Sequence, residues 1–512
     1  MRKPLVVAWE LVTQSVNACT GRPPVHYGDR HKNRLRRPGG GPSGGLHESF
    51  SGTQHVIHAI FQAAGTGETN DSVLPQLARS GFWKKLSFTH FIIYLVGFSE
   101  GLTHLAALAI YYMLKDDLGL SPAEVSALFI APALPWVFKP IFAFVSDSYP
   151  INGSRRKPYM VGFSLLEGMG FVMMGTFPTH ILTALMALFL ISVSAAFCSA
   201  VAEALVVETT AGQTMDQSAE NVSDFITAKA LGSLIVAYLS GYLLERTSKQ
   251  SIFLATAVFP LSISFITLFM DDISESTTYD IRSQLRMLMR FLKQSVIWGP
   301  ALYIFAYMAG PDYDDALFFY FTNKLGFSPT FMGTLRFTYG IAALVGVVLY
   351  RFFFKNSGFR KTLLATILVA VPIYVSPILL TTGANRTMGI SNKAFVLSGG
   401  FLIEATAEIQ LLPLLVLTAS ICPPGLEGSV YAVMMSVRNT GAMVSRGISA
   451  LLTYTAGITS TNFTHLTGYI VLCGASLLIP LIFLEYVPDD AEVERVKQYH
   501  DSLYAKIRQQ TA

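Results

Sequence analysis

LGLSP at residues 118–122 returns as LGFSP at residues 325–329, and each copy stands between two long apolar runs. A serine at the end of a loop can cap a helix N-terminus, and a proline fits the first helical position because no N–H group is needed there. Each copy therefore predicts a loop that leads into a helix. The same feature in two places 207 residues apart is what a duplicated helical bundle leaves behind.

The composition indicates a membrane protein. Of the 512 residues, 52% are hydrophobic and only 14% are charged, whereas soluble chains carry about 25% charged residues. From Phe88 onward, apolar stretches of about 20 residues follow one another, and each is long enough to cross a hydrocarbon layer of roughly 30 Å. We therefore expect an integral membrane protein with many spans.

Other classes of protein are disfavoured. The net charge is +4, but the positions of the basic residues do not suggest a nucleic-acid-binding face. Cys19, Cys198, Cys422 and Cys473 have no metal-ligand or disulfide spacing. The sequence contains no Walker motif and no nucleophile elbow. We expect no cofactor, no metal ion, no nucleic-acid partner and no enzymatic activity.

Twelve spans are predicted between two polar tails. Residues 1–85 include the glycine-rich run PGGGPSGG and are expected to form a disordered cytosolic tail. The cytosolic linker 271–296 separates an N-terminal bundle, 86–270, from a C-terminal bundle, 297–487, and residues 488–512 form a second cytosolic tail. The predicted spans are 88–114, 122–146, 158–178, 180–209, 221–245, 250–270, 297–323, 329–354, 360–382, 394–419, 428–457 and 463–486.

Basic residues indicate the orientation of these spans. Lys and Arg are far more frequent on the side that holds both chain ends, as at 155–157, than on the opposite side. Cytosolic loops of membrane proteins carry such an excess. We expect both termini in the cytosol of a monomeric, multi-pass plasma-membrane protein, with the lipid bilayer and a small-molecule substrate as partners.

The repeat extends into other spans. Aligning the fifth span with the eleventh places Lys229 opposite Arg438, an offset of 209 residues. The fourth and tenth spans align Glu203 with Glu408, an offset of 205 residues. Such similar offsets favour two six-helix halves in parallel orientation. The expected fold is therefore all-α, with twelve transmembrane helices in two pseudo-symmetric halves.

Several motifs resemble those of a known family. The chain contains, in order, KDDLGLSP at 115–122, PWVFKPIFAFVSDSYPINGSRRKPY at 135–159, ALVVE at 204–208, DDALF at 314–318 and GTLR at 333–336. Together they resemble the folate–biopterin transporter family, a branch of the major facilitator superfamily, over residues 88–486. The resemblance implies the major facilitator fold and a pterin-type substrate. The family often carries two aspartates where this chain has Ser199 and Glu203, a departure that bears on the substrate more than on transport.

Basic side chains inside spans are candidates for substrate binding. A charge in the hydrocarbon layer costs several kcal/mol unless it is paired or hydrated. Lys229 and Arg438 would lie roughly 12 and 15 Å from the cytosolic helix ends, on opposite sides of one central cavity. Both could bind the carboxylates of an anion such as folate. Arg446 is a further candidate, and the alternative for each is a structural salt bridge.

Acidic groups complete the predicted binding site. Glu203 could accept two parallel N–H bonds from the amidine-like edge of a pterin, and Ser199 lies one turn earlier on the same face. The alternative is an ion pair between Glu203 and Lys229. Glu100 joins the predicted substrate-binding set. Glu167 lies in a span that is usually peripheral in this fold, and we interpret it as structural.

The seventh span predicts a site for proton coupling. It contains GPDYDD at 310–315, where a proline removes a backbone hydrogen bond and three acids crowd together. Repulsion between carboxylates favours protonation of at least one of them. The first candidate for proton coupling is Asp315 and the second is Glu408, with Asp312 and Asp314 as further candidates. Glu404 shares a helix face with Glu408 and is assigned to substrate binding.

The loop at 147–157 resembles the gating motif of major facilitators. It begins with an acid, turns at Gly153 and ends in the basic run RRK. Such a loop would latch the cytosolic side through contacts that break on opening. The predicted gating residues are Asp147, Arg155, Arg156, Glu208 and Lys139.

We expect a secondary active transporter that moves a folate, a pterin or a related organic anion by alternating access with proton coupling. Three alternatives stay open. A carrier of cations such as S-adenosylmethionine would suit Glu203 and the acids of the seventh span. A nutrient receptor would bind its ligand without moving it. A membrane-embedded enzyme would need a nucleophile or metal cluster, which the sequence does not offer.

Overall fold

A computed structural model describes residues 88–177, 180–209, 215–270, 295–354, 357–421, 427–489, 491–495 and 498. The predicted tail 1–85, most of the linker 271–296 and most of the tail 488–512 lie outside these residues. The structure from Ile92 onward forms one compact unit. Among the residues given above, the regular elements are all helical, apart from one isolated bridge between Ile151 and Ser154.

The repeated pentapeptide folds as predicted in both copies. Ser121 accepts a hydrogen bond from the Glu124 backbone and Glu124 bonds back to the Ser121 backbone, a capping box with Pro122 in the first turn. Ser328 caps the later helix in the same way by accepting from the Phe331 backbone. The preceding glycines, 119 and 326, both have a φ of 65°, a conformation that glycine adopts without steric cost.

The likeness of the two copies continues upstream. Each is preceded by a π-helical turn, η2 (Met113–Asp117) and η3 (Tyr320–Lys324), at corresponding positions. The two regions also contact each other, because the Lys115 ammonium donates a hydrogen bond of 2.9 Å to the Asn323 side chain. The repeat read from the sequence is therefore a repeat of backbone geometry.

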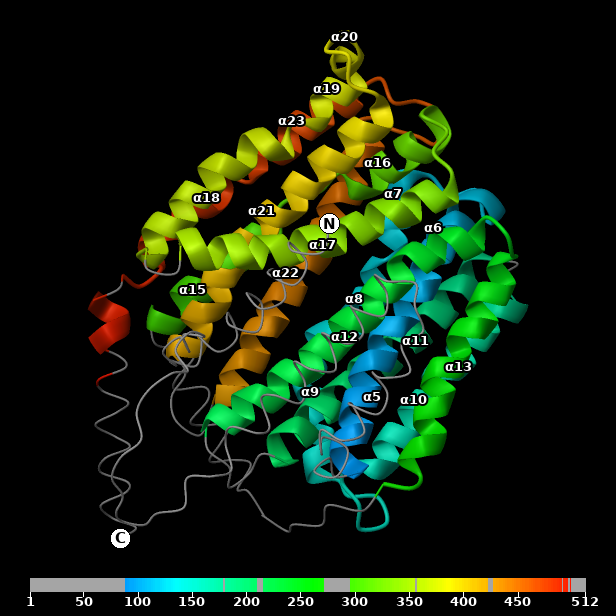
Figure 1. Cartoon of the computed structure of the whole chain (residues 1–512), viewed down its shortest axis with the longest axis vertical. Helices are drawn as coiled ribbons and strands as arrows, with labels where there is room; N and C mark the ends of the chain where they lie inside the picture. The colour runs from blue at the N-terminus through cyan, green and yellow to red at the C-terminus, as the bar shows by residue number, and fades with distance from the viewer. Residues whose placement is uncertain are drawn as a thin grey trace, which may run out of the picture. The chain divides into compact units, whose positions relative to one another are not determined.

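The N-terminal half contains most of the blue-to-green helices of Figure 1. Its elements are α5 (Phe88–Leu102), η1 (Thr103–Leu105), α6 (Ala106–Tyr112), α7 (Pro122–Leu128), α8 (Ile130–Val137), α9 (Lys139–Ser148), α10 (Lys157–Thr176), α11 (Ile181–Thr209), α12 (Met215–Leu244) and α13 (Lys249–Thr267). Within this half, α10 packs against both α11 and α13.

The C-terminal half forms the green-to-red part of the same view (Figure 1). Its elements are α15 (Ser295–Met308), α16 (Asp314–Phe319), α17 (Pro329–Phe353), α18 (Phe359–Tyr374), α19 (Pro377–Thr381), α20 (Ala384–Thr387), α21 (Asn392–Ile421), α22 (Glu427–Thr455), α23 (Leu466–Ser476) and η4 (Ile479–Tyr486). Here α21 packs against α17 and α18, and α18 also contacts α23.

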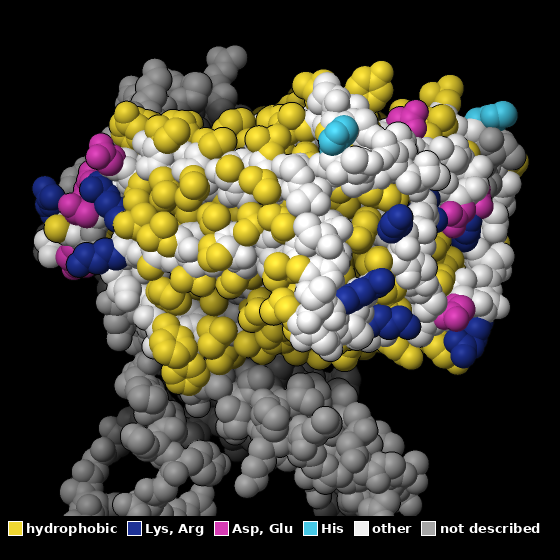
Figure 2. Space-filling model, turned by 90° about the horizontal axis from the view of Figure 1, so that it is seen from above, with side chains coloured by type: hydrophobic (Ala, Val, Ile, Leu, Met, Phe, Trp, Pro, Cys, Tyr) yellow, Lys and Arg dark blue, Asp and Glu magenta, His cyan; other side chains and the backbone are white. Residues whose placement is uncertain are grey.

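All twelve predicted spans coincide with helical segments, and nine described helices are long and apolar enough to cross a membrane. The spans predicted at 158–178, 297–323 and 428–457 are helical but fall outside those nine, so the count of twelve crossings stays a prediction. Figure 2 shows one face covered largely by hydrophobic side chains, with charged groups gathered towards its ends. Exposed apolar residues such as Ile141, Leu182 and Ile482 suit contact with lipid.

The two halves meet where α12 packs on α17 and where α22 packs on α7 and α8. At the first contact the backbones approach closely, because Gly241 lies against Gly333 and the carbonyl oxygen of Pro329. A Cβ atom on Gly241 would lie 2.8 Å from the Gly333 Cα atom, which is shorter than real Cβ contacts. Glycine is therefore required for this contact between the halves.

Replacing Gly241 should loosen the junction between the halves. We expect Gly241→Ala to destabilise the protein by about 1–3 kcal/mol, since backbone atoms must move to admit the methyl group. The measurement is the midpoint of thermal unfolding in detergent. The matched control is Gly162→Ala in α10, where a Cβ atom meets nothing within 4 Å. Equal midpoints for the two variants would show that the Gly241 contact is not tight.

Candidate functional site

A proline-interrupted span positions Lys139. Pro135 lies inside α8 and Pro140 in the first turn of α9, so the helix is broken at Phe138 and restarts at Lys139. The Lys139 ammonium lies 2.6 Å from Glu203 Oε1 and 3.0 Å from Ser199 Oγ. Lys139, predicted to support the gate, thus contacts two residues predicted to bind substrate.

A second ion pair joins α12 to α5. The Lys229 ammonium lies 2.5 Å from Glu100 Oε1, and the Glu100 side chain is 12% exposed. The two helices touch through glycines, because a Cβ atom on Gly232 would lie 3.2 Å from the Gly101 Cα atom. This close approach brings Lys229 opposite Glu100.

These pairings differ from the one considered from the sequence. An ion pair between Glu203 and Lys229 was the structural alternative, but Glu203 pairs with Lys139 and Lys229 pairs with Glu100. The physical reason is the break in the second span, which delivers an additional cation next to Glu203. The structure records no contact between Lys229 and Arg438 among the residues it describes.

The indole of Trp136 lies beside both ammonium groups. Lys139 Nζ is 5.5 Å and Lys229 Nζ is 5.9 Å from the ring centroid, within the range of cation–π attraction. The indole N–H donates a hydrogen bond of 3.1 Å to Ser192, which fixes the ring. Asn439 of α22 donates to the Trp136 carbonyl at 3.0 Å, so this site on the N-terminal half also contacts the C-terminal half.

Two arginines of the C-terminal half, Arg336 and Arg438, have no such partner among the described residues. Within the described part of the chain, no ion pair or hydrogen bond reaches the side chain of Arg438, and its Nε atom is buried. Arg438 is close enough to Glu408 to act on its charge, but they form no ion pair. Arg336 of α17 likewise has no hydrogen bond or ion pair among the described residues, and it lies near His104.

The acids of the seventh span lie at the break between α15 and α16. The Asp312 backbone N–H donates to Ser449 at 2.9 Å, and the Asp312 carboxylate accepts from Ser445 at 3.1 Å. Asp314 follows in the first turn of α16, with its backbone N–H donating to Asp312. The break is thus held by serines of α22.

Asp315 lies at the junction of the two halves. Ser126 of α7 donates a hydrogen bond of 2.5 Å to its carboxylate, which is nearly buried. Asp312, Arg446 and Tyr111 are the other groups that act on it. The Arg446 guanidinium lies 5.2 Å from the centre of the Phe129 ring. Among the predicted residues, Asp315 and Arg446 are therefore brought together, away from the Lys139 and Lys229 pairs.

The predicted gating loop has a compact fold. Arg156 forms an ion pair with Asp147 and donates 2.6 Å to Ser146. The turn between them has positive φ at Asn152 and Gly153. Arg155 precedes Arg156 in the same turn, and the Glu208 side chain lies outside the described side chains.

Sequence reasoning overlooked three contributors to this region. Trp136 lies inside the motif that carried the family resemblance, and Arg336 ends the GTLR stretch of the same set. Their presence in those motifs was a usable signal. Asn439 had none, because its contact with Trp136 depends on how the two halves meet.

Comparisons with known proteins agree with this architecture. The BT1 family matches residues 100–507 of the chain. The chain is 50% identical over 435 residues to "Folate transporter 2" of Plasmodium falciparum (isolate 3D7). This alignment covers 85% of this chain and 95% of that protein. It is 34% identical over 409 residues to "Folate-biopterin transporter" of Synechocystis sp., with coverage of 79% and 83%.

Solved structures show the same fold at low sequence identity. A mutant form of the nucleoside transporter NupG aligns with a TM-score of 0.60 at 12% identity, covering 78% of this chain and all of that one. A D-xylose-proton symporter aligns with a TM-score of 0.59 at 14% identity, covering 79% and 98%. The predicted major facilitator fold is confirmed.

These matches also exclude the enzyme alternative, because the family and its members are transporters. The protein is a multi-pass integral membrane protein with a small-molecule substrate. The chain belongs to the BT1 family, the folate–biopterin transporters.

Proposed function

We propose that this protein carries a folate, a pterin or a related organic anion across a membrane by alternating access, coupled to proton movement. Relatives named as folate transporters support this substrate class. We further propose that it works as a monomer in the plasma membrane with both termini in the cytosol, which the excess of Lys and Arg on the side of the termini supports.

One observation carries the proposal of an anionic substrate. The ammonium groups of Lys139 and Lys229 each have a carboxylate partner, whereas Arg336 and Arg438 have none among the described residues. A cation at membrane depth without a counter-charge is costly. The carboxylates of a folate would supply that counter-charge, and the planar guanidinium suits a bidentate contact with a carboxylate.

The region around Lys139 and Lys229 offers partners for a flat heterocycle. The Trp136 ring presents an aromatic face, and the Glu203 side chain is about half exposed at 52%. A carboxylate can accept two parallel N–H bonds from the amidine-like edge of a pterin, and aromatic rings stack on an indole. We propose that Trp136, Glu203 and Ser199 bind the ring system while Arg438 and Lys229 bind the carboxylates.

Contacts between the halves support alternating access. Ser126 with Asp315 and Asn439 with Trp136 both cross the junction. Asp147 with Arg156 closes a loop at the predicted cytosolic gate. In the proposed cycle Asp315 carries a proton, and the loss of the Asp315 charge weakens its contact with Ser126. Asp312, Asp314 and Glu408 are further candidates for the proton carrier. Glu404 and Arg446 line the path of the substrate.

Counterflow in proteoliposomes tests the transport proposal. Vesicles loaded with unlabelled folic acid should accumulate labelled folic acid from outside, because a carrier exchanges the two. Competition by unlabelled pterins, nucleosides and S-adenosylmethionine identifies the preferred class. Binding without exchange would favour a receptor, and competition by S-adenosylmethionine alone would favour a cation carrier.

Replacing Arg438 should discriminate between ligands by their carboxylates. We expect Arg438→Gln to weaken folic acid uptake by roughly 10- to 100-fold, since a charge-assisted pair contributes about 1.5–3 kcal/mol. Pteroate, which lacks the glutamate, should lose much less. The control is Arg246→Gln, an arginine stacked on Tyr242 at the end of α12. Equal losses for folic acid and pteroate would contradict the role.

Replacing Asp315 should separate accumulation from exchange. Asp315→Asn removes the ionisable group, so uptake driven by a pH gradient should be abolished while exchange at equal pH persists. Uptake with and without an imposed gradient is the measurement. Asp489→Asn in the C-terminal segment is the control, as this exposed residue lies outside the spans. Uphill accumulation by Asp315→Asn would remove Asp315 from the coupling mechanism.

A further inference from the structure

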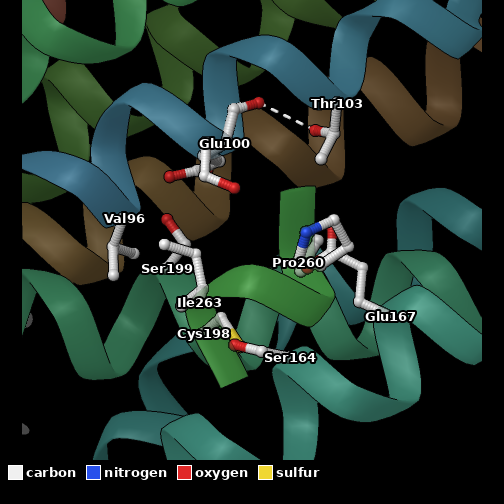
Figure 3. Close-up of a pocket in the computed structure, with 11 residues that line it drawn as sticks. Val96, Glu100, Thr103, Ser164, Glu167, Cys198, Ser199, Pro260 and Ile263 are labelled. Carbon is white, nitrogen blue, oxygen red and sulfur yellow. Dashed lines mark hydrogen bonds between the residues drawn. The ribbon is translucent and has the colours of Figure 1, made fainter. Parts of the chain in front are cut away.

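A small cavity lies inside the N-terminal half, between α5, α10, α11 and α13. The volume of the cavity is about 20 Å³, which is enough for one water molecule. The polar groups on its wall come mainly from Glu100, Glu167, Ser164 and Ser199. Figure 3 shows Glu100 on α5 and Glu167 on α10 reaching the cavity from two different helices.

Both carboxylates on this cavity lack a full set of partners. Glu167 is 6% exposed, and the described residues provide no hydrogen bond or ion pair to its carboxylate. Glu100 uses Oε1 to bind Lys229, while its Oε2 atom is buried with no hydrogen-bond partner. A buried carboxylate oxygen without a partner costs free energy unless it binds a proton, a cation or water.

The other ionisable groups around Glu167 are few. Glu100 of α5 and Lys229 of α12 act on its charge, and Cys198 of α11 lines the same cavity. The wall from α13 consists of Pro260 and Ile263, which carry no charge. The buried carboxylate of Glu167 therefore has no cation of its own, because the Lys229 ammonium is paired with Glu100.

We propose that Glu167 and Glu100 form a proton-binding site, bridged by a water in this cavity, that controls whether Lys229 is available to the substrate. The proposal rests on the anion transport proposed above. It assigns to Glu167 a role in coupling in place of the structural one expected from its span.

The cavity suits a proton better than a metal ion. Several of its oxygens are already engaged: Ser199 accepts from Lys139, and Thr103 donates to the Glu100 carbonyl. Ser164 is paired with Cys198. That leaves the Ser99 hydroxyl and the two carboxylates, which are too few ligands for a metal ion that prefers about six oxygens, and the Lys229 ammonium repels a further cation. A proton needs only one carboxylate oxygen and a water.

The proposed step moves one proton and changes one ion pair. Glu167 first binds a proton from the aqueous side, forming an O–H bond. Glu167 then gives this proton to the bridging water as that water gives one to Glu100 Oε2, so one carboxylate O–H bond breaks and another forms. Neutral Glu100 no longer balances the Lys229 ammonium. Lys229 can then bind a carboxylate of the substrate, and the reverse transfer follows substrate release.

Proton uptake on binding tests the proposal directly. Folic acid is added to purified transporter in weakly buffered detergent solution, and an indicator dye reports protons taken up, with a protein-free blank. We expect the wild type to take up protons, Glu167→Gln to take up fewer, and Glu167→Asp to resemble the wild type. Glu494→Gln, an exposed residue near the C-terminal end of the described chain, is the matched control and should equal the wild type.

Folic acid affinity should also depend on pH with a defined sign. Because binding needs a protonated Glu100, wild-type affinity should weaken as pH rises, by up to about tenfold per pH unit for one linked proton. Glu100→Gln should bind folic acid tightly with little dependence on pH, since its Lys229 is permanently released. This variant keeps the proposal testable if Glu167→Gln fails to fold.

The outcomes separate this proposal from the transport proposal. Absence of folic acid counterflow in the wild type overturns the proposed function itself. Normal counterflow with equal proton uptake by the wild type and Glu167→Gln overturns the proton site alone. Glu100→Gln binding that remains weak and pH-dependent overturns it too. Folic acid binding should be the same when sodium is replaced by choline. If wild-type binding depends on sodium and this dependence disappears in Glu167→Gln, the site binds a metal ion and the proposed proton site is overturned.

Discussion

A charge buried at membrane depth needs a counter-charge, and this constraint organises the centre of the protein. In the N-terminal half two lysines meet this requirement internally, since Lys139 pairs with Glu203 and Lys229 with Glu100. In the C-terminal half, Arg336 and Arg438 have no such pair among the described residues. The two halves share a backbone plan but differ in charge balance, and that difference is what makes an anionic ligand chemically reasonable.

Backbone geometry determines which charges meet. Gly101 and Gly232 let α5 and α12 approach until Lys229 faces Glu100. The break at Phe138 restarts a helix at Lys139, beside Glu203. Trp136 then lies next to both ammonium groups while its carbonyl accepts a hydrogen bond from the other half. Small residues and prolines, which carry no chemistry themselves, thus position the groups that do.

Features set by neighbouring residues could be predicted from the sequence. The caps at Ser121 and Ser328 involve residues three apart, and the long apolar runs became helices at the expected places. Partners on different helices could not be predicted in the same way. The sequence motif suggests a gating role for Lys139 and offers Glu203 as a partner for Lys229, because spacing along one helix does not say which neighbouring helix faces it. Glu167 is interpreted as structural because its span is usually peripheral in this fold, although it lines a cavity with Glu100.

The paired π-helical turns bear on the history of the chain. A π turn hydrogen-bonds from residue i to i+5 and so takes up one residue more than an α turn. Both copies, Met113–Asp117 and Tyr320–Lys324, contain that additional residue at the same point before the serine cap. If the halves descend from one ancestral segment, the extra residue was already present before the gene doubled, and neither descendant has since lost it.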